Sequence, residues 1–89
     1  MRIYYYNGRE IRRSNRAYTF AWLGKEGRAT AMSNDKERLI KEREKAIESW
    51  RELYERAVKE NNTKWIDCYR KGYERVKASE VVEVEFIEK

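Results

Sequence analysis

The chain has 89 residues, which is enough for one domain with a single, modest hydrophobic core. Charged residues make up 42% of it and aromatic residues 13%, and this aromatic content, together with clear periodicity, excludes a disordered chain. There is no histidine, which excludes the commonest general base and the commonest zinc ligand. No apolar run approaches the length of a signal peptide or a transmembrane span, and Cys68 is the single cysteine, so we expect a cytoplasmic protein.

The positive charge is concentrated in the first third of the chain. Residues 1–33 hold seven bases and two acids, whereas residues 34–89 hold fourteen of each. Six of the seven bases are arginine, and half of the chain's aromatic residues lie among them. Arginine presents a planar fork of donors that suits phosphate, and it stacks on aromatic rings. The pattern therefore predicts a surface for an anionic ligand on the N-terminal segment.

The first element is a hairpin, because three tyrosines are followed by Asn7-Gly8, the strongest two-residue signal for a type I′ turn. Counting outward from this turn places Tyr4 opposite Ile11. Side chains alternate along a strand, so one face of the hairpin collects every second residue. That face contains Arg2, Tyr4, Tyr6, Arg9 and Ile11.

A second hairpin is expected over residues 17–33, with a four-residue loop at 24–27. Counting outward places Trp22 opposite Ala29 and Phe20 opposite Ala31, and large rings beside small alanines pack well under a helix. We therefore expect the core face to carry Tyr18, Phe20 and Trp22.

The opposite face of the second hairpin, which carries Ala21, Leu23 and Met32, is expected to be wholly or partly exposed. The helices also hold more apolar residues than one small sheet covers. Contiguous exposed apolar surface marks an interface, so the sequence predicts a homo-oligomer, most simply a dimer.

Two helices are expected next. Asn34 caps the first, with Glu37 completing a capping box, and the apolar spacing continues to residue 60. Asn61 and Asn62 interrupt the helix formers, and a second helix follows over residues 63–78. We favour a helical hairpin, but the apolar stripe keeps its phase through the break. A continuous helix of about 45 residues, roughly 67 Å long, therefore stays open.

Two residues of the second helix need a separate account. Gly72 is costly inside a helix, so we expect it to permit close approach of the neighbouring helix. Cys68 is expected to be a partly buried, inert thiol.

The last element is a strand over residues 80–88, with Val82, Val84 and Phe86 pointing inward. The predicted fold is α+β within one domain, 1–89. A small antiparallel sheet of four or five strands, from the N-terminal hairpins (1–33) and the C-terminal strand, packs against a helical hairpin (34–78).

The sequence offers no catalytic constellation. The serines and Cys68 have no histidine to act as their base, and the four glycines form no phosphate-binding loop. We therefore expect neither an enzyme nor a cofactor or metal site. The predicted function is binding of nucleic acid, or of a phosphorylated nucleotide, cyclic nucleotides included, with tyrosines stacking on bases and arginines on phosphates. The candidate ligand-binding residues are Arg2, Tyr4, Tyr6, Arg9, Arg12, Arg13, Arg16 and Arg28.

Two alternatives stay open for the arginines. In the first, the arginines serve solubility, and Arg12 and Arg13 neutralise the C-terminal glutamates Glu80, Glu83 and Glu85. In the second, the arginines meet an acidic patch on another protein, which would make the chain a protein–protein inhibitor.

Two resemblances add to these expectations. Arg9-Glu10-Ile11-Arg12-Arg13, Tyr18–Leu23 and Arg28–Ser33, followed by a helix from Asn34, resemble the order of elements in AP2-type and integrase arm-binding domains. That resemblance implies a three-stranded sheet lying in the DNA major groove. In size and charge density the chain also resembles small phage anti-defence proteins, such as anti-CRISPR proteins and sponges for cyclic-nucleotide signals. This second resemblance implies an inhibitor of a host enzyme such as a CRISPR nuclease.

Overall fold

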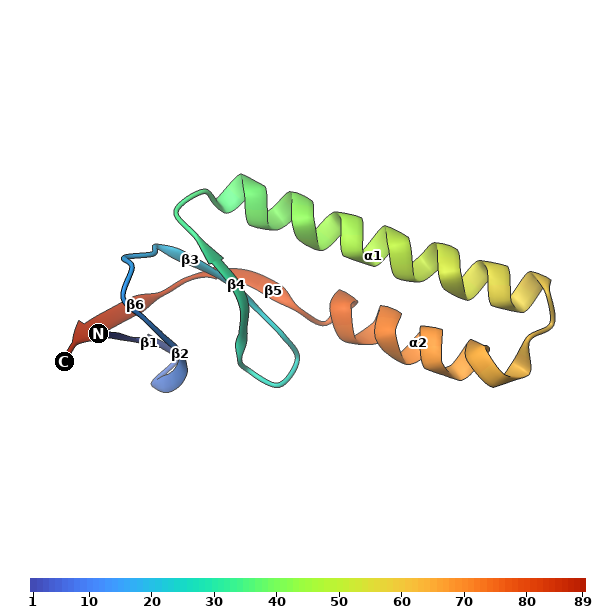
Figure 1. Cartoon of the computed structure of the whole chain (residues 1–89), viewed down its shortest axis with the longest axis horizontal. Coiled ribbons are helices and arrows are strands. Elements are labelled where there is room, and N and C mark those ends of the chain that lie inside the picture. The colour runs from blue at the N-terminus through green and yellow to red at the C-terminus, as the bar shows by residue number, and fades with distance from the viewer.

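The protein is described here by a computed structural model that covers all of residues 1–89. Six strands and two helices follow in the order β1, β2, β3, β4, α1, α2, β5 and β6, and the predicted α+β class is confirmed (Figure 1). The helices are α1 (Lys36–Lys59) and α2 (Thr63–Lys77). The strands are β1 (Arg2–Tyr6), β2 (Arg9–Ser14), β3 (Phe20–Leu23), β4 (Ala29–Ser33), β5 (Glu80–Glu83) and β6 (Glu85–Glu88).

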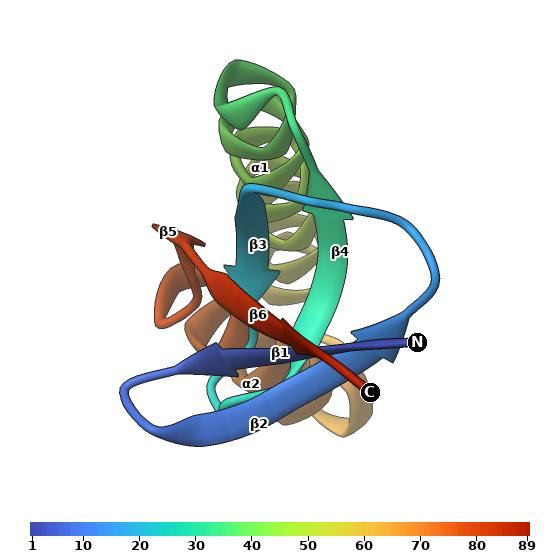
Figure 2. The same ribbon diagram turned by 90° about the vertical axis from the view of Figure 1, so that its left-hand side faces the viewer.

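The strands form two antiparallel sheets of three, ordered β2-β1-β6 and β4-β3-β5, where the sequence predicted one sheet. The C-terminal strand bends at Val84, so its first half joins one sheet and its second half the other. Val84 is buried at this corner, and its N–H donates to the carbonyl oxygen of Thr19 at 2.9 Å. Strands that change sheets in this way are typical of sheets packed at a steep angle. Figure 2 shows β1 and β2 lying across β3 and β4.

The first hairpin forms as predicted at its turn and departs from the prediction beyond it. Asn7 and Gly8 have φ values of 52° and 76°, both positive, as a type I′ turn requires. A bulge follows between Tyr4 and Tyr5, so Tyr4 pairs with Arg12 instead of Ile11. The bulge leaves Ile11 without a partner on β1, and the side chain of Ile11 is buried in the core.

The register of the second hairpin also differs from the prediction. Trp22 faces Ala31 and Phe20 faces Ser33, with a bulge after Trp22. Leu23 pairs with Ala29, which leaves a longer loop than the four residues that we counted. Counting residue pairs outward from the predicted loop gave the wrong register, because the apolar pattern shows neither the loop length nor the bulge.

The second sheet is covered on both faces, which corrects the predicted core face. Ala21 and Leu23, expected to be exposed, are buried against the first sheet, whereas Phe20 and Trp22 are half-buried on the opposite face. That opposite face lies under α1, where the ammonium group of Lys36 sits 5.9 Å from the Phe20 ring centroid. The Ala21 and Leu23 face is therefore unavailable for a dimer interface.

The hydrophobic core lies between the two sheets. Tyr6, Tyr18, Ala29 and Met32 pack partly buried around it. Val82 and Val84 point inward as predicted, whereas Phe86, on the edge strand β6, remains 39% exposed although its ring packs against that of Tyr4. The buried cluster consists of Tyr4, Ile11, Ala21, Leu23, Val82 and Val84.

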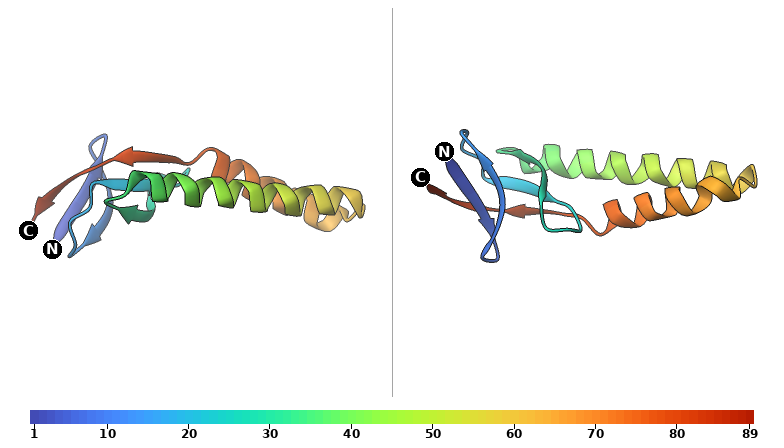
Figure 3. Two further views of the ribbon diagram at one scale, coloured as in Figure 1. Left: turned by 90° about the horizontal axis from the view of Figure 1, so that it is seen from above. Right: turned by 60° about the horizontal axis from the view of Figure 1, so that its bottom comes forward.

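The helices form a hairpin, which confirms that interpretation over the continuous helix. Asn61 adopts a left-handed conformation with φ of 53° and reverses the chain between α1 and α2. The hairpin extends away from the sheets as an arm, and the whole molecule measures 52 × 22 × 19 Å (Figure 3). We call residues 36–77 the helical arm.

The start of α1 corrects the predicted cap. Asp35, and not Asn34, is the N-cap, and its carboxylate accepts the N–H of Arg38 at 3.4 Å. Asn34 instead accepts the N–H of Thr19 and donates to the carbonyl oxygen of Ala17. Asn34 therefore links the segment before α1 to the segment before β3 through side-chain hydrogen bonds.

The two helices come closest where Gly72 faces Trp50. A Cβ atom on Gly72 would lie 2.6 Å from the Trp50 ring, so only glycine fits at this contact. The close approach predicted for Gly72 is thus confirmed. Cys68 is exposed, and not partly buried as expected.

Candidate anion-binding surface

The first sheet separates its charges by edge. β2 forms one edge and carries Arg9, Arg12 and Arg13, while β6 forms the other and carries Glu85 and Glu88. β1 lies between them, so the edges are about two strand spacings, or about 10 Å, apart. No ion pair joins β2 to the C-terminal strands. The proposed neutralisation of these arginines by the C-terminal glutamates is therefore not found.

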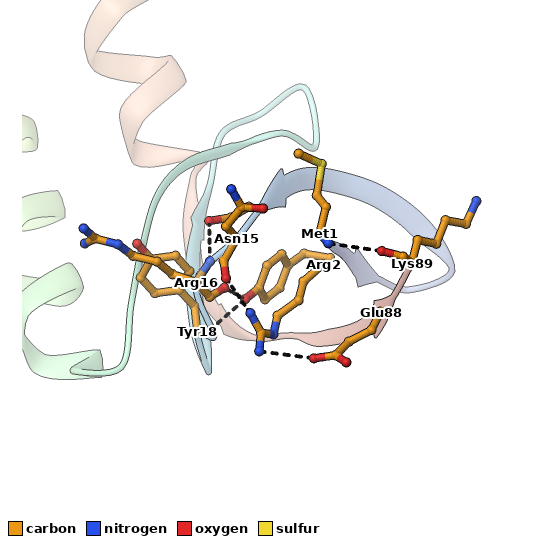
Figure 4. A network of polar contacts seen from close by, with 9 residues as sticks. Met1, Arg2, Asn15, Arg16, Tyr18, Glu88 and Lys89 are labelled. Atoms are coloured by element: carbon orange, nitrogen blue, oxygen red, sulfur yellow. Dashed lines mark hydrogen bonds and ion pairs between the residues drawn. The ribbon is translucent and has the colours of Figure 1, made fainter.

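Arg2 belongs to a network that joins the two ends of the chain (Figure 4). Its guanidinium donates to the carbonyl oxygen of Asn15, and one of its nitrogens lies 3.1 Å from a carboxylate oxygen of Glu88. Beside it, the terminal ammonium of Met1 donates to the carbonyl oxygen of Lys89 at 3.1 Å. These contacts engage both terminal nitrogens of the half-buried guanidinium, so Arg2 is a structural residue and not part of a free cationic surface.

Tyr4 is a core residue, which corrects its predicted stacking role. Its side chain is 0% exposed, and its ring packs against the rings of Tyr18 and Phe86. Its hydroxyl donates to the carbonyl oxygen of Arg16 and accepts the N–H of Tyr18 at 2.8 Å. A ring enclosed in this way cannot stack on a ligand.

Arg12 and Arg13 are neighbours in β2 with different partners. The Nε of Arg13 donates to a carboxylate oxygen of Glu10 at 2.6 Å. This hydrogen bond, reinforced by the charge of Glu10, raises the pKa of Arg13 above its ordinary value. Arg12 is exposed and forms no ion pair. Only Arg12 of the two offers an uncompensated charge.

Tyr6 and Arg9 lie beside a hollow of about 270 Å³ between the tip of the first hairpin and the loop of the second. The guanidinium of Arg9 lies against Gly27, and Lys25 and Glu80 also line the hollow. Tyr6 is half-buried and packs against the core, so its ring is only partly available. In this hollow two N-terminal bases, Arg9 and Lys25, meet beside a tyrosine.

Arg16 lies at the opposite end of β2, after the strand has ended. Its side chain points away from the network of the chain ends (Figure 4) and lines a hollow of about 640 Å³ together with Tyr18. The start of α1 forms the other wall, where Arg38 pairs with Glu42. Arg16 itself forms no ion pair.

Of the eight predicted site residues, four are thus exposed bases without an ion-pair partner. Three of them, Arg9, Arg12 and Arg16, follow one another along β2 and its continuation, at intervals of three and four residues. Arg9 and Arg12 lie within β2, and Arg16 lies two residues beyond its end. Arg28 is also exposed but lies apart, after the loop of the second hairpin. We call Arg9, Arg12 and Arg16 the arginine row.

The sequence reasoning missed a second group of bases. Lys71 and Arg75 of α2 line a hollow of about 460 Å³ with Lys25, beside Glu26 and Glu74. α2 holds five bases and two acids. The acidic C-terminal strand cancels this excess when charges are summed over residues 34–89, so the sum does not show it. Lys71 and Arg75 are four residues apart, and like charges at that spacing destabilise a helix. That spacing is the signal that identifies them in the sequence.

The sheet implied by the AP2-type and integrase arm-binding resemblance does not form. β2 belongs to one sheet, while β3 and β4 belong to the other. The three segments therefore do not make the continuous three-stranded surface that those domains lay into the major groove.

No family model, no curated protein and no solved structure matches this chain. The side chains form no group of three or more potential metal ligands. Neither helix has the length and apolar character needed to cross a membrane.

Proposed function

We propose that the protein is a non-enzymatic, cytoplasmic nucleic-acid-binding protein that contacts phosphates through the arginine row. The observation that supports this is the position of Arg9 and Arg12 on an open edge strand, with Arg16 just beyond its end, all three exposed and without carboxylate partners. Guanidinium groups form charge-assisted, bidentate hydrogen bonds with phosphate oxygens. Lys25, Lys71 and Arg75 extend the basic surface beyond the row.

A row of bases suits an extended polyanion better than a single nucleotide. The hollow beside Arg9 and Lys25, at about 270 Å³, lies below the usual volume of a small-ligand pocket, roughly 300–1,000 Å³, and it contains the carboxylate of Glu80. The hollow beside Arg16, at about 640 Å³, is large enough, but Asp35 and Glu42 line it and oppose a phosphate. With Tyr4 in the core, the row has few exposed rings to stack on bases. The proposal is therefore binding through the backbone, with little dependence on base sequence.

The test is the salt dependence of binding, measured by fluorescence anisotropy with a labelled single strand and a labelled duplex. Replacing Arg9, Arg12 and Arg16 with glutamine removes three phosphate contacts, so the slope of log K against log salt for single strands should fall by about 2. The matched control replaces Lys41, Lys45 and Arg56, three exposed bases of α1, and removes the same net charge. Its slope should stay near that of the native protein. Equal losses in both variants would contradict a specific role for the row.

A thermal-shift screen, read together with the anisotropy assay, separates the other two ligand classes. Binding of a cyclic or linear mononucleotide in a thermal-shift screen, without binding of either strand, would replace this proposal with a small-ligand site at Arg9 and Lys25. If neither nucleic acid nor a mononucleotide bound at low salt, the proposal would be wrong, and an acidic protein surface would become the ligand class to test.

A further inference from the structure

The helical arm lacks a core of its own. α1 and α2 contain 24 and 15 residues, but only Leu39 and Ala57 of α1 are buried, and α2 has no buried residue. Trp65 of α2 is 43% exposed. Each helix has one helical neighbour, so every apolar side chain outside the line of contact is only partly covered.

A second apolar stripe runs along α1 beside the line of contact with α2. Ile40, Ile47 and Tyr54 are spaced seven residues apart and are all half-buried, and Val58 continues the stripe with 49% exposure. At 3.6 residues per turn the stripe lies about 60° around the helix from Trp50, which packs on α2. A seven-residue apolar repeat is the pattern with which one helix receives another.

α2 extends this apolar side. Its half-buried Ile66 and Tyr73 are also seven residues apart. α1 and α2 run in opposite directions, so successive side chains rotate around the two helix axes in opposite senses when both are seen from one end. Ile66 and Tyr73 therefore lie on the same side of the hairpin as the α1 stripe. The arm therefore has one apolar side built from both helices.

Two opposite charges flank the stripe at the same spacing. Glu44 and Arg51 are seven residues apart, both exposed, on the margin of the stripe away from α2. Neither takes part in an ion pair within the chain. A two-fold axis near Ile47 that set two α1 helices antiparallel would bring Glu44 of each copy beside Arg51 of the other.

We propose that the occupant of this apolar side is the arm of a second copy, with α1 antiparallel to α1 around a two-fold axis near Ile47. Ile47 then meets its equivalent between two Glu44–Arg51 pairs, and Ile40 meets Tyr54 of the second copy farther out on each side. α1 and α2 are about 36 and 22 Å long and each is about 10 Å wide, giving a footprint of about 600 Å². Standard-size interfaces bury about 600–1,000 Å² per partner, so the arm reaches the lower end of that range. This inference is independent of the proposed function.

The test uses charge reversal and light scattering at physiological salt over a range of micromolar concentrations. The native protein should be a dimer. Glu44→Arg and Arg51→Glu should each raise the dimer dissociation constant by about tenfold or more, because each puts like charges together twice. An equimolar mixture of the two variants should form a heterodimer, since every pair in it is again opposite in charge. The double variant Glu44→Arg/Arg51→Glu should also dimerise.

The matched control is Lys45→Glu/Glu52→Arg, an exposed pair with the same spacing on the opposite side of α1. It should leave the dimer unchanged, whereas Ile47→Asp, at the axis, should abolish it. Circular dichroism at equal concentration verifies that each variant retains its helices. A native protein that stays monomeric would overturn the proposal, as would a control as disruptive as Glu44→Arg or a variant mixture that remains monomeric.

Discussion

The sheets and the helical arm differ in how completely they bury a similar apolar pattern. Eight of the ten buried residues lie outside the helices, although the helices account for 24 and 15 of the 89 residues. β3 has the first sheet on one side and α1 on the other, so Ala21 is covered completely. Each helix of the arm has only one helical neighbour. The number of layers, more than the pattern of apolar residues, decides what becomes core.

The two regions also differ in how they arrange charge. The first sheet places arginines on β2 and glutamates on β6, with β1 between them. α1 mixes both signs along its length, with ion pairs such as Arg38–Glu42, whereas α2 keeps an excess of five bases over two acids. Separated charge leaves a field that attracts a polyanion, whereas mixed charge mostly cancels. This contrast supports the first sheet as the main ligand surface, extended by the bases of α2, and α1 as an assembly surface.

The largest expected effect is on the core of the sheets. Tyr4→Ala should lower the free energy of unfolding by about 3–5 kcal/mol, because it removes a fully buried ring. Trp65→Ala at the end of the arm should cost less than about 1.5 kcal/mol, since that ring is 43% exposed. Urea unfolding followed by circular dichroism measures both at one protein concentration. Equal losses would show that the arm is as well packed as the sheets.

The next effect tests the one close contact within the arm. Gly72→Ala adds about 1 kcal/mol of helix propensity, but its Cβ atom would lie 2.6 Å from the Trp50 ring. Overpacking costs about 1–3 kcal/mol, so we expect a net loss of stability. Cys68→Ala, at an exposed position of the same helix, is the control and should be nearly neutral.

A second variant shows whether the ring is the cause. Trp50→Leu should remove the clash, so the double variant Trp50→Leu/Gly72→Ala should lose less than the sum of the two single losses. A stabilising effect of Gly72→Ala alone would mean that the helices separate freely at this point.

The sequence predicted the elements well and their packing less well, for identifiable reasons. The Asn7-Gly8 turn, the break at Asn61 and the helix–helix contact at Gly72 are local signals, and each was confirmed. Register was wrong wherever a bulge occurred, because a bulge shifts all later pairs without changing the apolar pattern. The cap of α1 was misplaced because Asn34 and Asp35 are both good N-cap residues.

The candidate site was only partly predictable. Composition located the arginines but not their partners, since Arg2 meets Glu88 from the far end of the chain. Tyr4 was expected at the surface because alternation cannot tell which face of a hairpin a second sheet covers. Lys71 and Arg75 were overlooked because a sum of charges over 56 residues cancelled them against the C-terminal glutamates.

The third prediction compares Arg12 of the arginine row with its neighbour Arg13 and with Arg56 of the arm. Arg12→Ala should weaken binding of a single strand by about tenfold, or about 1.4 kcal/mol, the loss of one charge-assisted contact. Arg13→Ala should weaken it less, because Glu10 already occupies part of that guanidinium. Arg56→Ala in the arm should have almost no effect. Anisotropy titrations at one salt concentration measure all three, and equal effects would mean that only net charge matters.

The smallest expected effect has the opposite sign and concerns Glu10. Its carboxylate holds the Nε of Arg13 at 2.6 Å and raises the pKa of that guanidinium, so Arg13 stays charged but is partly neutralised. Glu10→Gln should free Arg13 and strengthen single-strand binding by about twofold. Glu37→Gln, in the first turn of α1, makes the same change in net charge within the arm. If both variants bound more tightly by the same factor, the separation of charge on the first sheet would not direct binding. A gain confined to Glu10→Gln would extend the arginine row to Arg13.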